Sequence, residues 1–348
     1  MNTGKMQRTV LGFSGSAASA AAIGWLREQQ GQEVVTVTLD VGQGDELAAV
    51  REQALTLGAV RAHVIDAREE LVRDYLLPAL QAGALMDGDA LTYPLLAKRL
   101  VDIARMESAS VIAHAAKPEA GAVLDAAIRS IDPASEITAV LAQWKPSDAE
   151  LSALARHRGL HAPVSSDVRV EASVWGRRIT GANIPDEAFT LTRDPQDCPD
   201  DPAVVDITLV RGVPVSTNGV EMPLNEMLES LETIAGAHGV GRSLAEQTAL
   251  EAPAACVLAI AHAALEQRAL GDDIAALKRQ LASVYARTIS SGQWFSDLRE
   301  GIDAFARVAS ARVSGTVRLT FSEGQCSVVH CNVASGSQPE STASRAVA

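Results

Sequence analysis

The chain has 348 residues, 47% of them hydrophobic, which is enough for two domains that each bury a core. Its formal net charge is −13, without any block of Lys and Arg, which argues against a nucleic-acid partner and against binding to an anionic membrane. No apolar run approaches the roughly 18 residues of a membrane span, and the first residues lack a signal-peptide pattern, so we expect a cytoplasmic protein.

The first half of the chain alternates predicted strands and helices. Strands are predicted at residues 9–13, 34–39, 63–65 and 111–113, and helices at residues 17–29, 45–57, 69–82 and 91–106. This alternation is typical of an α/β fold with a doubly wound parallel sheet. Gly58 suits the position after a helix end, and Pro78 predicts a kink or a break in the third helix. Such folds bind ligands beyond the carboxyl ends of the strands, where the strand order reverses.

The turn after the first strand is Ser14-Gly15-Ser16, and an alanine-rich helix follows it. Such a turn can bind phosphate, because the first backbone N–H groups of a helix have no partner within the helix. The same turn also suits tight strand-to-helix packing without a ligand, and its spacing matches neither common glycine motif for nucleotides. The segment VGQGDEL, residues 41–47, follows the second strand and leaves the same two interpretations open.

The second half changes character after residue 161. It contains a predicted hairpin at residues 204–217, a helix at 224–238, a long helical region at 253–290, another helix at 298–313 and a second hairpin at 316–330. This pattern predicts an α+β domain with long C-terminal helices. The tail, residues 332–348, is rich in Ser and Ala, and we expect it to be disordered.

The cysteines and acidic residues offer no strong metal motif. Four cysteines do not make a disulfide framework. In CSVVHC, alternation would put Cys326 and His330 on one strand face and Cys331 on the other, and an ordinary strand explains the segment. The run RDPQDCPDD, residues 193–201, lacks the glycine and the terminal glutamate of a calcium loop. We therefore predict no metal site.

Seven segments resemble the argininosuccinate synthase family, and they follow that family's order. They are VLGFSGSAASAAAIGWLREQ, VTVTLDVGQGDELAAVREQALTLGA, VIDAREELVRDYLLPALQAGAL, SVWGRRITG, IAGAHGVGR, EAPAACVLAIAHAALE and SGQWFSDLREGIDAFARVASARVSGTVRL. The resemblance covers nearly everything from residue 8 to residue 329. It implies a PP-loop nucleotide-binding domain at residues 1–165, a synthetase and oligomerisation domain at residues 166–331, and a homotetramer.

The resemblance also implies a reaction. Members of this family join citrulline to aspartate as a step of arginine biosynthesis. The ureido oxygen attacks the α-phosphate of ATP, pyrophosphate leaves, and the aspartate amine then displaces AMP. ATP and Mg²⁺ are implied here by the resemblance only.

Several nucleotide-site positions depart from the family. The family's loop SGGxDTS corresponds to residues 14–20, where the second glycine is Ser16, the aspartate is Ala18 and the last position is Ala20. Each lost hydrogen bond to a charged group costs about 1.5–3 kcal/mol, which predicts weak triphosphate binding. The residues that correspond to the nucleotide site are Ser14, Gly15, Ser16, Ser19, Leu39, His114 and Lys117.

The citrulline side departs further. The family's YPLGT segment has no counterpart, and only His114 and Lys117 match its HGxTGKGNDQxR loop, here residues 114–125. Two serines that serve citrulline correspond to Arg169 and Arg178, which either bind a small anion or face solvent as ordinary surface arginines. The shortened segment before Glu251 leaves the assignment of Glu246 open. The altered substrate pocket thus comprises Arg169, Arg178, Glu246 and Glu251.

These departures lead to one main expectation and two alternatives. The main expectation is a pseudoenzyme that no longer ligates citrulline and aspartate and serves as a scaffold, a regulator or a partner, since missing donors slow such catalysis strongly. One alternative is a repurposed ATP-dependent C–N ligase that acts on a different substrate. The other is a weak but genuine argininosuccinate synthase.

Overall fold

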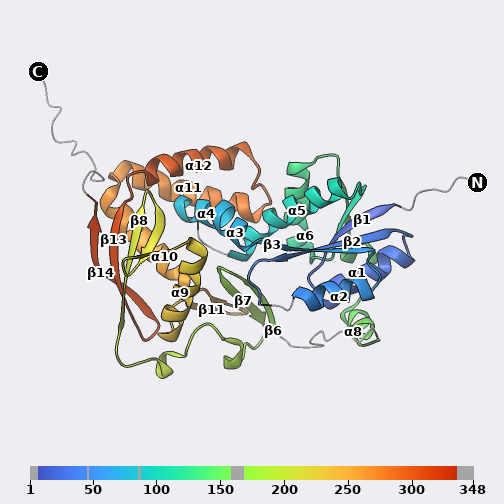
Figure 1. Cartoon of the computed structure of the whole chain (residues 1–348), viewed down its shortest axis with the longest axis horizontal. Helices are drawn as coiled ribbons and strands as arrows, with labels where there is room; N and C mark the ends of the chain where they lie inside the picture. Colours follow the sequence, from blue (N-terminus) through green and yellow to red (C-terminus); the bar gives the residue numbers. More distant parts are fainter. Residues whose placement is uncertain (1–6, 45–46, 85–87, 158–167, 335–348) are drawn as a thin grey trace, which may run out of the picture. The chain divides into compact units, whose positions relative to one another are not determined.

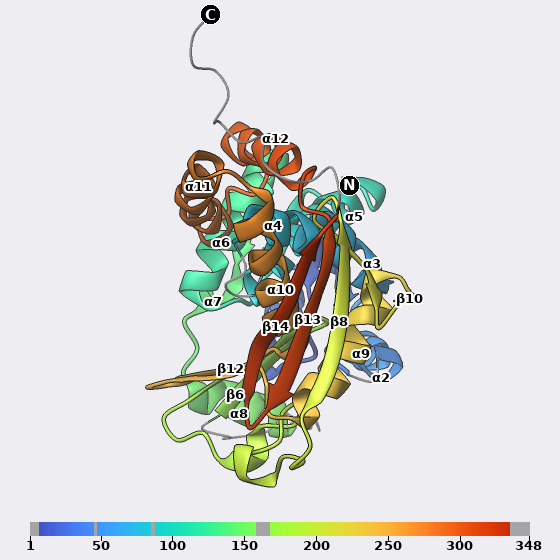
Figure 2. The same cartoon turned by 90° about the vertical axis from the view of Figure 1, so that its left-hand side faces the viewer.

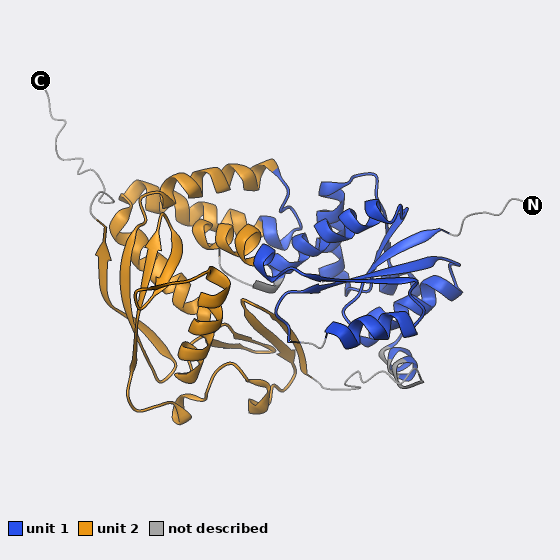
Figure 3. Ribbon diagram, viewed as in Figure 1, with its two compact units in different colours: residues 1–71, 90–166, 288–296 blue, residues 72–89, 167–287, 297–348 orange. Residues whose placement is uncertain are grey.

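The structure is a computed structural model that describes residues 7–44, 47–84, 88–157 and 168–334. Two compact units make up the chain, shown in Figure 3. Unit 1 comprises residues 1–71, 90–166 and 288–296, and unit 2 comprises residues 72–89, 167–287 and 297–348. The domain boundaries predicted from the sequence stay a prediction. Each unit takes in short stretches that lie far from its main part in the sequence.

Unit 1 is built on a five-stranded parallel sheet, as the sequence predicts. Its order is β3-β2-β1-β4-β5, and every neighbouring pair is parallel. Six consecutive residues of β2 are buried, because helices cover both faces of this strand. The strands are β1 (Arg8–Gly12), β2 (Glu33–Asp40), β3 (Arg61–Asp66), β4 (Val111–His114) and β5 (Glu136–Ala139).

Helices cover the two faces of this sheet (Figure 1). Helices α1 and α2 pack on one face, and α5 and α6 lie on the other. The apolar core under α1 and α2 includes Leu11, Ile23, Leu26 and Val34, all fully buried. The helices of unit 1 are α1 (Ala17–Glu28), α2 (Leu47–Thr56), α3 (Arg68–Leu71), α5 (Thr92–Met106), α6 (Pro118–Ile131), α7 (Val140–Trp144) and α8 (Asp148–His157).

Unit 2 contains two antiparallel sheets. One has the order β10-β9-β8-β13-β14, formed by β8 (Ala203–Val210), β9 (Val213–Thr217), β10 (Val220–Glu221), β13 (Gly315–Ser322) and β14 (Gln325–Val333). The other has the order β11-β12-β7-β6, formed by β6 (Val168–Ser173), β7 (Gly176–Gly181), β11 (Arg242–Ala245) and β12 (Thr248–Glu251).

The helices of unit 2 pack on the first of these sheets and on one another. Helix α10 contacts β8, β13 and β14, and α9 packs against α10. Figure 2 shows α10 behind β13 and β14, with α11 and α12 above them. The helices are α4 (Leu77–Ala82), α9 (Leu224–Ala237), α10 (Pro253–Ala269), α11 (Asp272–Ser290) and α12 (Asp297–Ser310).

Three local predictions need correction or refinement. The helical region predicted at residues 253–290 is two helices, because the chain leaves α10 at Leu270-Gly271 before α11 begins. Residues 118–125, expected to belong to a loop, open α6, since Pro118 occupies its first turn without needing an N–H partner. The kink or break predicted at Pro78 corresponds to a π-helical turn, residues 72–76, which lies just before Pro78 and separates α3 from α4.

A β-bulge overturns the predicted faces of β14. Between β13 and β14 the register shifts, so that His330 pairs with Arg318 while Val328 pairs with Leu319. The extra residue reverses the alternation, and Cys326 therefore shares its face with Cys331 instead of His330. Residues 332 and 333 of the predicted tail belong to β14, and residues 335–348 lie outside the described residues.

A buried charged cluster joins α10 to α11. Lys278 of α11 donates a hydrogen bond to Glu266 of α10, and His262 Nδ1 lies 3.3 Å from the same carboxylate. Burial lowers the pKa of Lys278 to about 7. Burial, and then the charge of Lys278, lower the pKa of His262 to about 3, so this imidazole is neutral at pH 7. The cluster therefore fixes two helices through groups that seldom lie inside proteins.

Candidate functional site: a phosphate-binding loop at the switch in strand order

The strand order of unit 1 reverses between β1 and β4. From β1 the chain proceeds to β2 and β3 on one side, and then returns to add β4 and β5 on the other. The loops that leave β1 and β4 therefore diverge, and the space beyond their carboxyl ends is the ordinary ligand site of this fold. Residues 14–16 follow β1, and residues 115–117 follow β4. The structure thus brings both predicted nucleotide-binding segments to adjacent strand ends.

The loop after β1 is shaped by one glycine and three serines. Gly15 has a φ of +75°, a conformation that side chains rarely adopt. Ser16 caps α1, and its Oγ accepts a hydrogen bond from the Ser19 backbone N–H at 3.3 Å. The Ser14 and Ser16 hydroxyls are 3.1 Å apart, and Ser16 Oγ lies 3.2 Å from Ser19 Oγ. Ser14 and Ser16 are exposed, whereas Ser19 is buried.

This loop fits a phosphate group. The backbone N–H groups of Ala17 and Ala18 form no hydrogen bond within the described residues, as is usual for the first turn of a helix. These N–H groups, the positive end of the helix dipole and the exposed hydroxyls of Ser14 and Ser16 all favour an anion. Most of the donors are backbone groups, which do not depend on the side chains at positions 18 and 20.

The loop after β4 is organised by a buried histidine. His114 is 3% exposed, and its Nδ1 accepts a hydrogen bond from the Ala116 N–H at 3.3 Å. The proton consequently lies on Nε2, which donates to Asp125 Oδ1 at 2.9 Å. A Cβ at Gly121 would come within 2.9 Å of the His114 ring, so only glycine leaves room for it. Asp125 and Gly121 have no local signal in the sequence, because neither lies next to His114 in the chain.

Lys117 and Leu39 complete the predicted nucleotide-binding set. Lys117 is exposed at the N-cap of α6, where its side chain makes no capping hydrogen bond. Leu39 lies near the end of β2 and is 9% exposed. Gly42 and Gly44, after β2, have φ values of +89° and +77°, which identify them as turn residues, while residues 45–46 lie outside the described part of the chain. The assignment of these residues to a nucleotide site stays a prediction.

Unit 2 places Arg169 and Arg178 on one face of a sheet. Arg178 of β7 pairs with Glu171 of β6, and Arg169 lies two residues before Glu171 on the same strand. Arg169 Nη2 lies 2.6 Å from Glu171 Oε1. The face therefore carries two cations and one anion, and an anionic ligand there would compete with Glu171. Binding of a small anion by these arginines stays a prediction.

Glu251 is a fully buried carboxylate that holds a loop. It accepts hydrogen bonds from Arg177 Nη1 at 3.0 Å and from the backbone N–H groups of residues 190, 191 and 192 at 3.2, 2.8 and 2.6 Å. The Thr192 hydroxyl donates another at 2.8 Å. This set of donors satisfies the carboxylate inside unit 2. Glu246, in contrast, is exposed in the turn between β11 and β12.

The structure adds two findings on metals and membranes. Among the residues that the structure describes, no three His, Cys, Asp or Glu side chains are grouped so that they could hold a metal ion. Magnesium in nucleotide sites takes many of its ligands from phosphates and water, so a dedicated protein cage is not required for it. Within the same described ranges, no helix is both long and apolar enough to cross a bilayer.

Comparison with known proteins identifies the family. The model of the arginosuccinate synthase N-terminal HUP domain matches residues 8–161, and that of the arginosuccinate synthase C-terminal domain matches residues 180–337. An argininosuccinate synthase from Oceanobacillus iheyensis is 36% identical over 93% of this chain and 84% of its own length. One from Symbiobacterium thermophilum is 35% identical over 91% of this chain and 86% of its own length. Among solved structures, an NH3-dependent NAD synthetase from Campylobacter jejuni covers 46% of this chain and 67% of its own, with a TM-score of 0.32 and 14% identity.

These similarities overturn the main functional expectation. The prediction of an inactive pseudoenzyme is wrong, because curated relatives with 34–36% identity over more than nine-tenths of the chain carry the name argininosuccinate synthase. That prediction gave too much weight to side chains at Ala18 and Ala20, although the first turn of α1 offers backbone donors whatever those side chains are. The alternative, a genuine synthase, agrees with the comparisons. The chain belongs to the argininosuccinate synthase family.

Proposed function

We propose that this protein is an argininosuccinate synthase, which joins citrulline to aspartate with cleavage of ATP to AMP and pyrophosphate. The observation that carries the proposal is similarity along nearly the whole chain, through both family domains, to proteins of that name. A protein of this kind acts in arginine biosynthesis. The altered positions in its loops predict a slower reaction, since each missing charge-assisted hydrogen bond weakens transition-state stabilisation.

Unit 1 supplies the nucleotide side of the proposed reaction. The triphosphate of the substrate ATP would lie at the N-terminus of α1, on the N–H groups of Ala17 and Ala18 and the hydroxyls of Ser14 and Ser16. Negative charge grows on the departing pyrophosphate while the ureido oxygen attacks the α-phosphate. Backbone N–H groups and a helix dipole that are already oriented stabilise this charge without reorganisation. Gly15 keeps the backbone close, because its φ of +75° turns the loop without a side chain.

Unit 2 supplies positive charge for the amino-acid substrates. Both citrulline and aspartate carry carboxylates, and guanidinium groups bind carboxylates through paired hydrogen bonds. Arg178 is half-buried and Arg169 is exposed on the same sheet face. We assign this face to a substrate carboxylate, with Glu171 holding Arg169 in place at 2.6 Å until the substrate arrives.

An isotope experiment tests this proposal directly. Purified protein is incubated with ATP, aspartate and citrulline labelled with ¹⁸O in the ureido group, and AMP is analysed by mass spectrometry. The label should appear in AMP, because the ureido oxygen bonds to the α-phosphate and its bond to carbon breaks when the amine enters. Omission of citrulline should abolish pyrophosphate release, and omission of aspartate should abolish the release of AMP.

Two variants test whether the loop after β1 is needed for activity. Gly15→Val should remove activity, since a branched side chain is strained at this φ and would meet Gln53. Arg279→Ala, on the exposed side of α11, should leave activity unchanged. Unlabelled AMP, or AMP release that does not require citrulline and aspartate, would refute the proposal.

We also propose a homotetramer. Helix α11 carries apolar residues at positions 274, 277, 281 and 284, a spacing that places them along one side of the helix. Leu277 is 44% exposed, and Ile274, Leu281 and Val284 are partly exposed. Such a stripe supports helix packing between subunits.

A further inference from the structure

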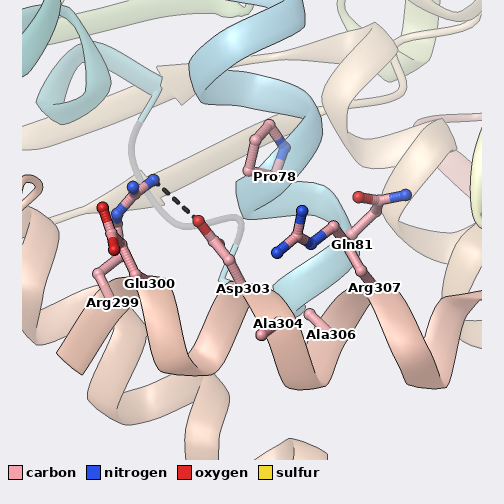
Figure 4. A pocket seen from close by; sticks show the side chains of 8 residues that line it. All are labelled: Pro78, Gln81, Arg299, Glu300, Asp303, Ala304, Ala306 and Arg307. Carbon is pink, nitrogen blue, oxygen red and sulfur yellow. Dashed lines mark ion pairs between the residues drawn. The ribbon is translucent and has the colours of Figure 1, made fainter. Parts of the chain in front are cut away.

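A pocket of about 550 Å³ lies between α4 and α12, within unit 2 and apart from the residues assigned to the synthase reaction. Helix α4 contributes Pro78 and Gln81, and α12 contributes charged residues and alanines. Figure 4 shows Arg299 and Glu300 toward one end of the view, Arg307 and Gln81 toward the other, and Asp303 between them. We call this the α4–α12 pocket.

An ion pair beside a buried tyrosine occupies part of the pocket. Arg299 Nη1 lies 2.9 Å from Asp303 Oδ2, and Asp303 also interacts with the buried hydroxyl of Tyr285. Burial raises the pKa of Tyr285, with the Asp303 charge as a further cause, so the phenol stays protonated beside the carboxylate. The Arg299 guanidinium and the Asp303 carboxylate therefore neutralise each other.

The two ends of the pocket carry opposite charges, and both act electrostatically on the Asp303 carboxylate between them. Within the described part of the chain, neither the Arg307 guanidinium nor the Glu300 carboxylate forms a hydrogen bond or an ion pair. They stand seven residues apart on α12, which corresponds to about 10 Å along the helix axis. Gln81 Nε2 donates to the Arg211 carbonyl at 3.3 Å and keeps a second N–H for another acceptor.

The surface between these ends is small and apolar. The Pro78 ring and the methyl groups of Ala304 and Ala306 line it. A simple anion would meet Glu300, and a simple cation would meet Arg307, so neither suits the whole pocket. A short amino acid with adjacent charges cannot reach both ends. The arrangement matches a molecule whose opposite charges are separated by an apolar chain.

We propose that the α4–α12 pocket binds an elongated zwitterion. Its carboxylate contacts Arg307 and Gln81, its ammonium group contacts Glu300, and its methylene chain lies on Pro78 and Ala304. The contacts at both ends are partly exposed to water, so each adds little alone and the two together set the selectivity. This site is independent of the synthase reaction.

Saturation-transfer NMR with 6-aminohexanoate tests the proposal on the full chain without synthase substrates. We expect its methylene protons to receive saturation and the dissociation constant to be on the order of 1 mM. Hexanoate, hexylamine and alanine should each bind at least about tenfold more weakly, because each lacks one end contact or the spacing. Equal binding of hexanoate or hexylamine, or no saturation with 6-aminohexanoate at tens of millimolar, would overturn the proposal.

Charge exchange distinguishes this site from unspecific binding. Arg307→Glu and Glu300→Arg should each weaken binding about tenfold, and the double variant should restore it with the ligand reversed. Both side chains are exposed, so we expect these variants to fold. Arg279→Glu on α11 is the matched control and should bind as the unaltered protein does. Unchanged affinity in Arg307→Glu would refute the assignment, whatever the synthase assay shows.

Discussion

The loop after β1 in unit 1 and the Glu251 carboxylate in unit 2 represent opposite ways of using polar groups. Ser14 and Ser16 are exposed, and the adjacent N–H groups of α1 have no partner within the described residues. Glu251 is 0% exposed and accepts hydrogen bonds from Arg177, from Thr192 Oγ1 and from three backbone N–H groups. The first arrangement leaves donors for a ligand, whereas the second uses its acceptor to fix the fold. Location near a family's substrate site does not by itself reveal which role a polar residue has.

The largest effect is expected from removing the buried carboxylate. Glu251→Ala removes the carboxylate that pairs with the Arg177 charge and leaves three backbone N–H groups without their acceptor. We therefore expect the free energy of unfolding to fall by about 3–5 kcal/mol. Urea unfolding of the variant and of the unaltered protein measures this difference. Glu246→Ala, five residues earlier in an exposed turn, should change it by less than about 0.5 kcal/mol. A similar small loss for both variants would show that the Glu251 carboxylate does not stabilise the fold more than an exposed one does.

The cluster of Lys278, Glu266 and His262 between α10 and α11 extends this comparison to the pH dependence of stability. Burial lowers the pKa of Lys278 from 10.5 to about 7, so between these values the unfolded chain binds a proton that the folded chain releases. Stability should therefore rise with pH across this window, by up to about 1.4 kcal/mol per pH unit. Below pH 7 the full cost of burying the charge is present.

In Lys278→Met, the increase of stability with pH that Lys278 causes should be absent. The difference in unfolding free energy between the unaltered protein and the variant, measured from pH 7 to pH 9.5, should change steadily in favour of the unaltered protein. Lys145→Met removes an exposed lysine of unit 1 and should leave the pH profile unaltered. A pH-independent difference for Lys278→Met would show that this ammonium group titrates as it does in the unfolded chain.

The smallest effect is expected in the open loop. Ser16→Ala removes the acceptor for the Ser19 N–H and should lower stability by about 1 kcal/mol, whereas Ser16→Gly should cost only a few tenths. Thermal unfolding of both variants measures this. Loss of several kcal/mol from Ser16→Ala would mean that the loop supports the fold as strongly as Glu251 does.

Local patterns predicted most of unit 1, because its elements differ strongly in periodicity. A few neighbouring residues are enough to predict the buried strand β2 and the turn at residues 14–16. Helix α6 was not recognised, since its start was interpreted as a family loop, although Pro118 is a common first residue of helices. The bulge in β14 was missed as well, because a single extra residue reverses every later face without an obvious local mark.

The partners of site residues could not be predicted in the same way. Asp125 lies eleven residues after His114, and Arg177 lies 74 residues before Glu251. These pairs form only when strands and helices meet, so no short segment contains both members. Burial of Glu251 likewise depends on the loop at residues 190–192, whose backbone donors have no signature in side-chain chemistry.

Unit 1 contains segments that lie far apart in the sequence, and this affects how it folds during synthesis. Gly292 belongs to this unit, and it approaches α6 so closely that a Cβ there would stand 2.2 Å from the Val123 carbonyl oxygen. The ribosome makes α6 more than 150 residues before it makes Gly292. Nascent chains thus carry an incompletely packed α6 through nearly half of translation, a period in which chaperones can bind it. Completion of the first unit must wait until most of the second has been synthesised.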